Sequence, residues 1–125
     1  MKALLLVVLF ALSFSHAACK GAGPAPAKSA IAEALAQLDV FILDVRSPGE
    51  YAGGHVDGAI NVPVDEIDRI EAILAEKDRQ IIVHCAAGVR SARAVSRLKE
   101  MGYTKILDAQ TPKAVANAMG TELVR

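Results

Sequence analysis

Cys85 is the residue of this chain whose type and surroundings best suit chemistry. An apolar run leads into it, and the residues that follow it are Ala86, Ala87, Gly88, Val89, Arg90 and Ser91. Small residues before a helix allow the chain to curl until several backbone N–H groups and the positive helix end face the sulfur. Such surroundings lower the pKa of a thiol from about 8.5 to roughly 3.5–7.5. The pattern predicts a nucleophilic thiolate, and an inert cysteine at a buried strand end is the alternative.

The elements that would position Cys85 alternate between strands and helices. Continuous apolar runs indicate buried strands at 40–43, 59–62, 80–84 and 105–107, and a turn is expected at 47–49. Helical spacing indicates helices at 29–38 with Ser29 as N-cap, at 65–76 with Asp65 as cap, from near Arg90 to Gly102, and from Thr111 or Pro112 to Met119.

The alternation of these elements predicts the fold class. It indicates an α/β domain with a mostly parallel sheet of about four or five strands and helices on both faces. In such sheets the functional residues lie at the carboxyl ends of the strands, and Cys85 follows one of these ends.

Length and composition limit the function classes. The chain has 125 residues, enough for one domain. Its 14 basic and 14 acidic residues give a formal charge of zero, which argues against a nucleic-acid binder with a basic face. Aromatic residues make up 4% and tryptophan is absent, so a base-stacking platform is not expected.

The first residues are typical of a secretory signal peptide, expected at 1–18. Lys2 precedes an apolar run at 3–12, which is shorter than the roughly 20 residues that a membrane span needs. Cleavage after Ala17 would release a free periplasmic protein. Cleavage before Cys19, where Ala17-Ala18-Cys19 resembles a lipobox, would give a lipoprotein anchored to the membrane through a lipid on Cys19. Residues 19–28 predict a flexible tether, and residues 29–125 the folded domain.

The two cysteines, Cys19 and Cys85, narrow the redox chemistry. If Cys19, at the signal boundary, is removed or lipidated, Cys85 is the one thiol of the exported domain. Such a thiol is expected either to be buried or to take part in the chemistry of the protein. A Cys19–Cys85 disulfide is an alternative. No second cysteine near Cys85 supports a dithiol mechanism, and no His/Cys cluster has zinc spacing, so neither a metal nor a cofactor is expected.

Three blocks of the sequence carry a resemblance to a known family. They read LDVRSPGEY at 43–51, GHVDGAINVP at 54–63 and VHCAAGVRS at 83–91. In this order and spacing they resemble the rhodanese-like sulfurtransferases, above all the single-domain periplasmic thiosulfate sulfurtransferases of the phage-shock type. The resemblance covers about residues 40–116. One departure is the segment 107–112, which has no glycine where most members carry a Gly-Gly pair.

The resemblance implies sulfur transfer through a persulfide. The Cys85 thiolate would take the outer sulfur of thiosulfate, or of a similar small anionic donor, and release sulfite. The backbone N–H groups from Ala86 to Ser91 would hold the terminal sulfur until a thiophilic acceptor, cyanide or a thiol, removes it. Arg90 would attract the anionic donor, and a solvated helix residue is the alternative for it.

The resemblance also implies supporting residues around the loop. They are Asp44, Arg46, Glu50 and His55. An Arg46–Glu50 ion pair is expected to brace the fold, and His55 is expected to pack rather than to act as a base. His84, at the end of a buried strand, is expected to be a core residue whose ring nitrogens have hydrogen-bond partners.

Two other functions remain as alternatives. Phosphatases of the cell-cycle type share this fold, and their nucleophile loop has the spacing Cys-x5-Arg. An arsenate reductase is an alternative of the same kind. Here the sixth residue after Cys85 is Ser91, and the arginine comes one residue earlier. The shorter spacing suits a single sulfur atom better than a phosphate. The second alternative is a non-catalytic rhodanese-like module for binding or redox sensing.

Overall fold

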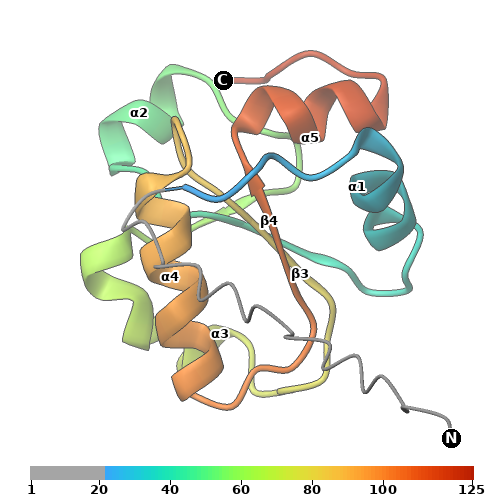
Figure 1. Cartoon of the computed structure of the whole chain (residues 1–125). Helices are drawn as coiled ribbons and strands as arrows, with labels where there is room; N and C mark the ends of the chain where they lie inside the picture. The colour runs from blue at the N-terminus through green and yellow to red at the C-terminus, as the bar shows by residue number, and fades with distance from the viewer. Residues whose placement is uncertain (1–21) are drawn as a thin grey trace, which may run out of the picture.

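The computed structural model describes residues 22–125. The predicted signal segment and Cys19 lie outside the described residues. The elements in chain order are α1 (Lys28–Leu35), β1 (Phe41–Asp44), α2 (Pro48–Gly53), β2 (Ile60–Asn61), the 3-10 helix η1 (Val64–Arg69), α3 (Ile70–Ile73), β3 (Ile81–His84), α4 (Val89–Glu100), β4 (Ile106–Gln110) and α5 (Pro112–Met119). Figure 1 shows their arrangement.

The sheet has four parallel strands in the order β2-β1-β3-β4. The strands β1 and β3 are buried along their whole length, which explains why both read as unbroken apolar runs. Helices cover both faces, with α4 and η1 on one and α1 and α5 on the other. The predicted parallel sheet between two helical layers is confirmed.

The two core clusters follow the alternation of side chains along β3. Ile81 and Val83 pack with Leu98 of α4, whereas Ile82 packs on the opposite face with Ile31 of α1. Cys85 continues the first set, two residues beyond Val83, and belongs to the α4 side of the core. The strand therefore carries the sulfur to the face where α4 begins.

A β-bulge interrupts the pairing of β3 with β4 near the carboxyl ends of both strands. Val83 pairs with Asp108, but the next residue, His84, pairs with Gln110, so β4 contains one extra residue. The irregularity brings the Gln110 carbonyl to the Cys85 N–H, which donates to it at 3.0 Å. The end of β4 is thus fixed directly beside the cysteine.

The turn predicted at 47–49 was wrong. Residues 48–53 form α2, because Ser47 accepts a hydrogen bond from the Glu50 N–H while the Glu50 side chain accepts from the Ser47 N–H. Pro48 occupies the first helical turn, where its missing N–H costs nothing. The Ser-x-x-Glu spacing was the available signal for this helix.

Two other helix predictions were also wrong in detail. The single helix expected at 65–76 is the 3-10 helix η1 followed by the four-residue α3, with a break at Glu66, whose φ of −113° is not helical. The N-cap of α1 is Ala27, not Ser29. The terminal helix starts at Pro112 as predicted, and the Thr111 side chain caps it.

No helix within residues 22–125 is long and apolar enough to cross a membrane.

Candidate active site

Cys85 lies at the carboxyl end of β3, in a short loop that ends at the first residue of α4. Its side chain is buried, with 1% of the residue exposed. Gly88 closes the loop as the residue before α4, and its φ of 101° is one that other residues adopt only with strain. The loop is therefore tight, and its backbone wraps around the sulfur.

The backbone of the loop faces the sulfur atom. The Gly88 N–H donates a hydrogen bond to the Cys85 Sγ at 3.0 Å. Burial alone raises the pKa of Cys85, but the polar groups of Ser91 and the backbone amides of Ala87 and Gly88 outweigh it, so the pKa is lowered. The environment thus favours the thiolate, which is the reactive form of a cysteine.

Ser91 supports the loop from the first turn of α4. It is fully buried, and its hydroxyl donates to the Gly88 carbonyl at 3.0 Å. Of the six predicted loop residues, Gly88 hydrogen-bonds to the sulfur, and Ala87 and Ser91 contribute to the lowered pKa of Cys85. The side chains of Ala86 and Val89 are exposed. Val89 is 61% exposed and forms an apolar surface beside the loop.

Arg90 pairs with Glu50, and the predicted Arg46–Glu50 ion pair was wrong. The two terminal guanidinium nitrogens of Arg90, Nη1 and Nη2, lie 2.6 and 2.9 Å from the two carboxylate oxygens of Glu50. The hydrogen bond from Arg90 is the main reason why the pKa of Glu50 falls to about 2. Both side chains are about a third exposed, so the pair lies at the surface beside the loop.

Arg46 instead pairs with Asp44, in a buried site at the end of β1. Arg46 Nη2 lies 2.7 Å from Asp44 Oδ2, and the Arg46 N–H also donates to this carboxylate. The same Nη2 donates to the Gly54 carbonyl at 2.7 Å, so the pair ties β1 to the chain after α2. Asn61, which the sequence did not single out, donates to the Asp44 and Arg46 carbonyls and joins β2 to the same point.

His55 packs on Tyr51. The two rings are stacked with centroids 3.8 Å apart, and His55 Nδ1 lies 2.8 Å from the Tyr51 carbonyl oxygen. The backbone of His55 exchanges hydrogen bonds with Val124 near the end of the chain. These contacts are those of a packing residue.

His84 is fully buried, but the prediction that its ring has hydrogen-bond partners was wrong. Neither ring nitrogen has a partner among the described residues. Burial is the main cause that lowers the pKa of His84 to about 4. The ring is therefore neutral at physiological pH. The sequence could indicate that His84 is buried, but not which polar groups would meet the ring.

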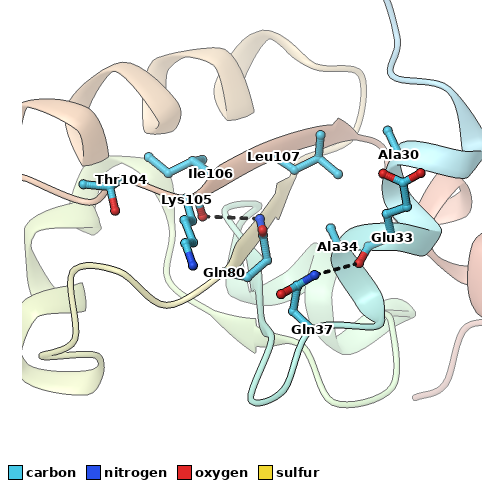
Figure 2. Close-up of a pocket in the computed structure, with 9 residues that line it drawn as sticks. All are labelled: Ala30, Glu33, Ala34, Gln37, Gln80, Thr104, Lys105, Ile106 and Leu107. Carbon is cyan, nitrogen blue, oxygen red and sulfur yellow. Dashed lines mark hydrogen bonds between the residues drawn. The ribbon is translucent and has the colours of Figure 1, made fainter.

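A pocket elsewhere on the domain contains none of these residues. It has a volume of about 380 Å³ and lies between α1 and the start of β4 (Figure 2). Gln80 and Gln37 extend into it and hydrogen-bond to the backbone oxygens of Lys105 and Glu33. Because β4 begins there and ends beside Cys85, the pocket lies at the opposite end of the sheet. Within residues 22–125, no group of three His, Cys, Asp or Glu side chains is placed to hold a metal ion.

Comparisons with known proteins agree with this geometry. The family model described as the rhodanese-like domain matches residues 27–110. Thiosulfate sulfurtransferase PspE of Escherichia coli K12 is 41% identical over 75 residues, which are 59% of this chain and 72% of that protein. A sulfurtransferase of Allochromatium vinosum is 34% identical over 70 residues, or 56% of this chain and 64% of that protein. A tRNA uridine(34) hydroxylase of E. coli O1:K1 is 30% identical, but the match spans only 21% of it.

Solved structures show the same relationship. A rhodanese with anions from E. coli matches with a TM-score of 0.62 and 37% identity, over 69% of this chain and 98% of that chain. A rhodanese-related protein from Thermoplasma volcanium matches with a TM-score of 0.61 and 31% identity, over 80% and 96% of the two chains. The sequence blocks, the parallel sheet and the cysteine loop at its carboxyl end have one common explanation: the chain belongs to the rhodanese-like domain family.

Proposed function

We propose that this protein is a sulfurtransferase that carries sulfur as a persulfide on Cys85. The observation that carries the proposal is the hydrogen bond of 3.0 Å from the Gly88 N–H to the Cys85 Sγ, in a loop that lowers the pKa of the thiol. A thiolate in such a loop can attack a sulfur atom without a general base. The sulfurtransferases among its relatives support this class of reaction.

The donor is thiosulfate or a similar small anion. The Cys85 thiolate attacks the outer sulfur of thiosulfate, a new S–S bond forms, and the original S–S bond breaks with its electron pair leaving on sulfite. The product is a persulfide anion, whose terminal sulfur takes over the role of the thiolate as acceptor of N–H groups between Ala86 and Ser91. The charge that the loop must hold is thus the same before and after the step.

The acceptor completes the cycle. Cyanide or a cellular thiol attacks the terminal sulfur, the persulfide bond breaks, and the electron pair returns to Cys85 as thiolate. Cyanide leaves as thiocyanate. Neither step needs an external oxidant or reductant, because the sulfur atom moves as a group between two nucleophiles. Two displacements with a covalent intermediate give ping-pong kinetics.

Arg90 supplies positive charge for the donor. Its guanidinium stands at the start of α4, and its pKa is raised by the hydrogen bond to Glu50, with the charge of Cys85 contributing. The Glu50 carboxylate orients Arg90 and offsets part of its charge. We assign Arg90 to donor attraction and Glu50 to its orientation, while Asp44, Arg46 and His55 brace the surrounding fold.

A phosphatase is the weaker candidate. A phosphate held in a cysteine loop needs the arginine for its oxygen atoms, and here both ends of the Arg90 guanidinium are bonded to Glu50. A non-catalytic binding module is the other alternative. Such a module would have the same cysteine loop but would not catalyse sulfur transfer.

Steady-state kinetics test these functions against each other. We expect the purified protein to form thiocyanate from thiosulfate and cyanide with parallel double-reciprocal plots, and Cys85→Ser to abolish it. Cys19→Ser is the matched control and should leave the rate unchanged. Turnover of an aryl phosphate would favour the phosphatase, and no turnover of either substrate would favour the binding module.

We also propose that the protein is exported to the periplasm, on the basis of Lys2 and the apolar run at 3–12. Radiolabelled palmitate on Cys19 in growing cells would support a membrane-anchored lipoprotein. A soluble periplasmic protein without label would support cleavage after Ala17.

A further inference from the structure

Residues 22–27, here called the strap, lie against the loop that holds Cys85. The strap runs from the amino end of α4 towards α1 (Figure 1). A methyl group placed on the Gly88 Cα would be only 2.8 Å from the Ala22 Cβ, so the strap packs directly on this glycine. The Gly88 N–H is the group that donates to the sulfur. The strap therefore covers the outer side of the backbone turn that surrounds the thiol.

Gln110 holds the strap in this position. Its Nε2 donates to the Gly23 carbonyl at 2.7 Å, and its side-chain carbons would lie 3.3 Å from the same methyl group on Gly88. In the described part of the chain, this is the one hydrogen bond between residues 22–26 and the rest of the domain. All strap residues except Pro26 are exposed. A single side chain thus joins a lightly held segment to the cysteine loop.

The backbone of Gln110 has a conformation that favours glycine. Its φ is 67°, in the left-handed region, where a glycine would have no strain. A glycine would also keep the carbonyl that accepts the Cys85 N–H. What the glutamine adds at this position is the side chain that binds the strap.

The turn on which the strap packs surrounds a buried sulfur. Cys85 is 1% exposed, whereas transfer requires a donor and then an acceptor to approach Sγ. We propose that Gln110 is a specificity-determining residue: by latching the strap over the Gly88 turn, it admits small reagents to Cys85 and excludes bulky ones until the strap is released. The substrates concerned rest on the proposed function, but the control of access does not.

Alkylation of Cys85 tests this proposal without requiring sulfur transfer. The reagents are iodoacetamide, which is small, and fluorescein maleimide, which is bulky, and the modified peptide that contains Cys85 is quantified by mass spectrometry. Gln110→Asn keeps a residue that tolerates the left-handed conformation but is one methylene too short for Gly23. We expect the ratio of bulky to small rates to rise about three- to tenfold, the change in an opening equilibrium on loss of one hydrogen bond.

A second variant leaves Gln110 in place. Pro24→Gly with Pro26→Gly loosens the strap itself without changing the cysteine loop or Gln110, and should raise the same ratio. Combined with Gln110→Asn, it should add less than its separate effect, because both changes release the same contact. An unchanged ratio in both variants, or fully additive effects, would overturn the proposal. If the ratio rises but no thiocyanate forms, access control stands and the proposed function fails.

Discussion

Arg90 and Glu50 form a two-pronged ion pair between the first turn of α4 and the helix α2, with N–O distances of 2.6 and 2.9 Å. The pair orients a cation beside a buried sulfur while its carboxylate offsets part of the charge. It also links the cysteine loop to the Ser47 cap, because the same Glu50 side chain accepts from the Ser47 N–H. The two partners should therefore have opposite effects on an anionic substrate.

Arg90→Met removes the positive charge, and we expect the KM for thiosulfate to rise about two- to tenfold with a smaller change in kcat. Glu50→Gln leaves Arg90 uncompensated but keeps a side chain that can cap α2, so the KM should fall. Arg93→Met, at an exposed position of the same helix, is the matched control and should change the KM little. Equal increases in KM for the first two variants would show that the pair only supports the structure.

Gly88→Ala tests the backbone turn. The substitution places a methyl group against Ala22 and Gln110, at a φ of 101° that alanine adopts only with strain, so we expect the turn to shift and the N–H to move away from the sulfur. We expect the pKa of Cys85, read from the pH dependence of alkylation, to rise and the sulfur transfer rate to fall about a hundredfold, as on loss of one oriented N–H donor.

Gly102→Ala is the control for backbone strain. Gly102 has a similar φ of 97°, but nothing lies within 4 Å of the added methyl group. This variant should lose stability by about 1–2 kcal/mol without any shift in the pKa of Cys85. A similar pKa shift in both variants would refute the role of the Gly88 amide.

His84 should make the stability depend on pH. Its pKa is about 4 in the folded protein, below the ordinary 6.5, so the unfolded chain binds the proton more readily. The unfolding free energy should therefore fall as the pH drops from about 6.5 to 4, by up to about 3 kcal/mol. Urea unfolding at several pH values measures this slope. His84→Leu should remove it, and an unchanged slope in that variant would assign the dependence to other groups.

Asp44→Asn should destabilise the domain strongly. The change leaves the Arg46 guanidinium buried without its carboxylate, which costs about 3–5 kcal/mol for a buried pair. Asp65→Asn breaks the exposed pair with Arg93 and should cost less than about 1 kcal/mol. Comparable losses in the two variants would contradict a bracing role for Asp44.

The sequence indicated the elements that local pattern controls. The apolar runs of β1 and β3 could be recognised because both strands are buried on both faces. The small residues after Cys85 could be recognised because they form the loop around the sulfur. The partner of Glu50 could not be read, because Arg46 and Arg90 both lie within reach in a sheet of this kind and only the burial of Asp44 decides between them.

The role of Gln110 could not be predicted from the sequence either. The missing glycines at 107–112 could be noticed, but the bulge pairs Gln110 with His84 of another strand, and the contact with Gly23 joins residues 87 positions apart. The unpartnered ring of His84 also depends on what the folded core places around it.

Mass spectrometry of the protein after incubation with thiosulfate tests the central claim most directly. If the amides around Cys85 stabilise first a thiolate and then a persulfide, the peptide that contains Cys85 should gain about 32 Da, one sulfur atom, and lose it again when cyanide is added. The gain should be absent in Cys85→Ser. A peptide of unchanged mass after incubation with excess thiosulfate would contradict the account.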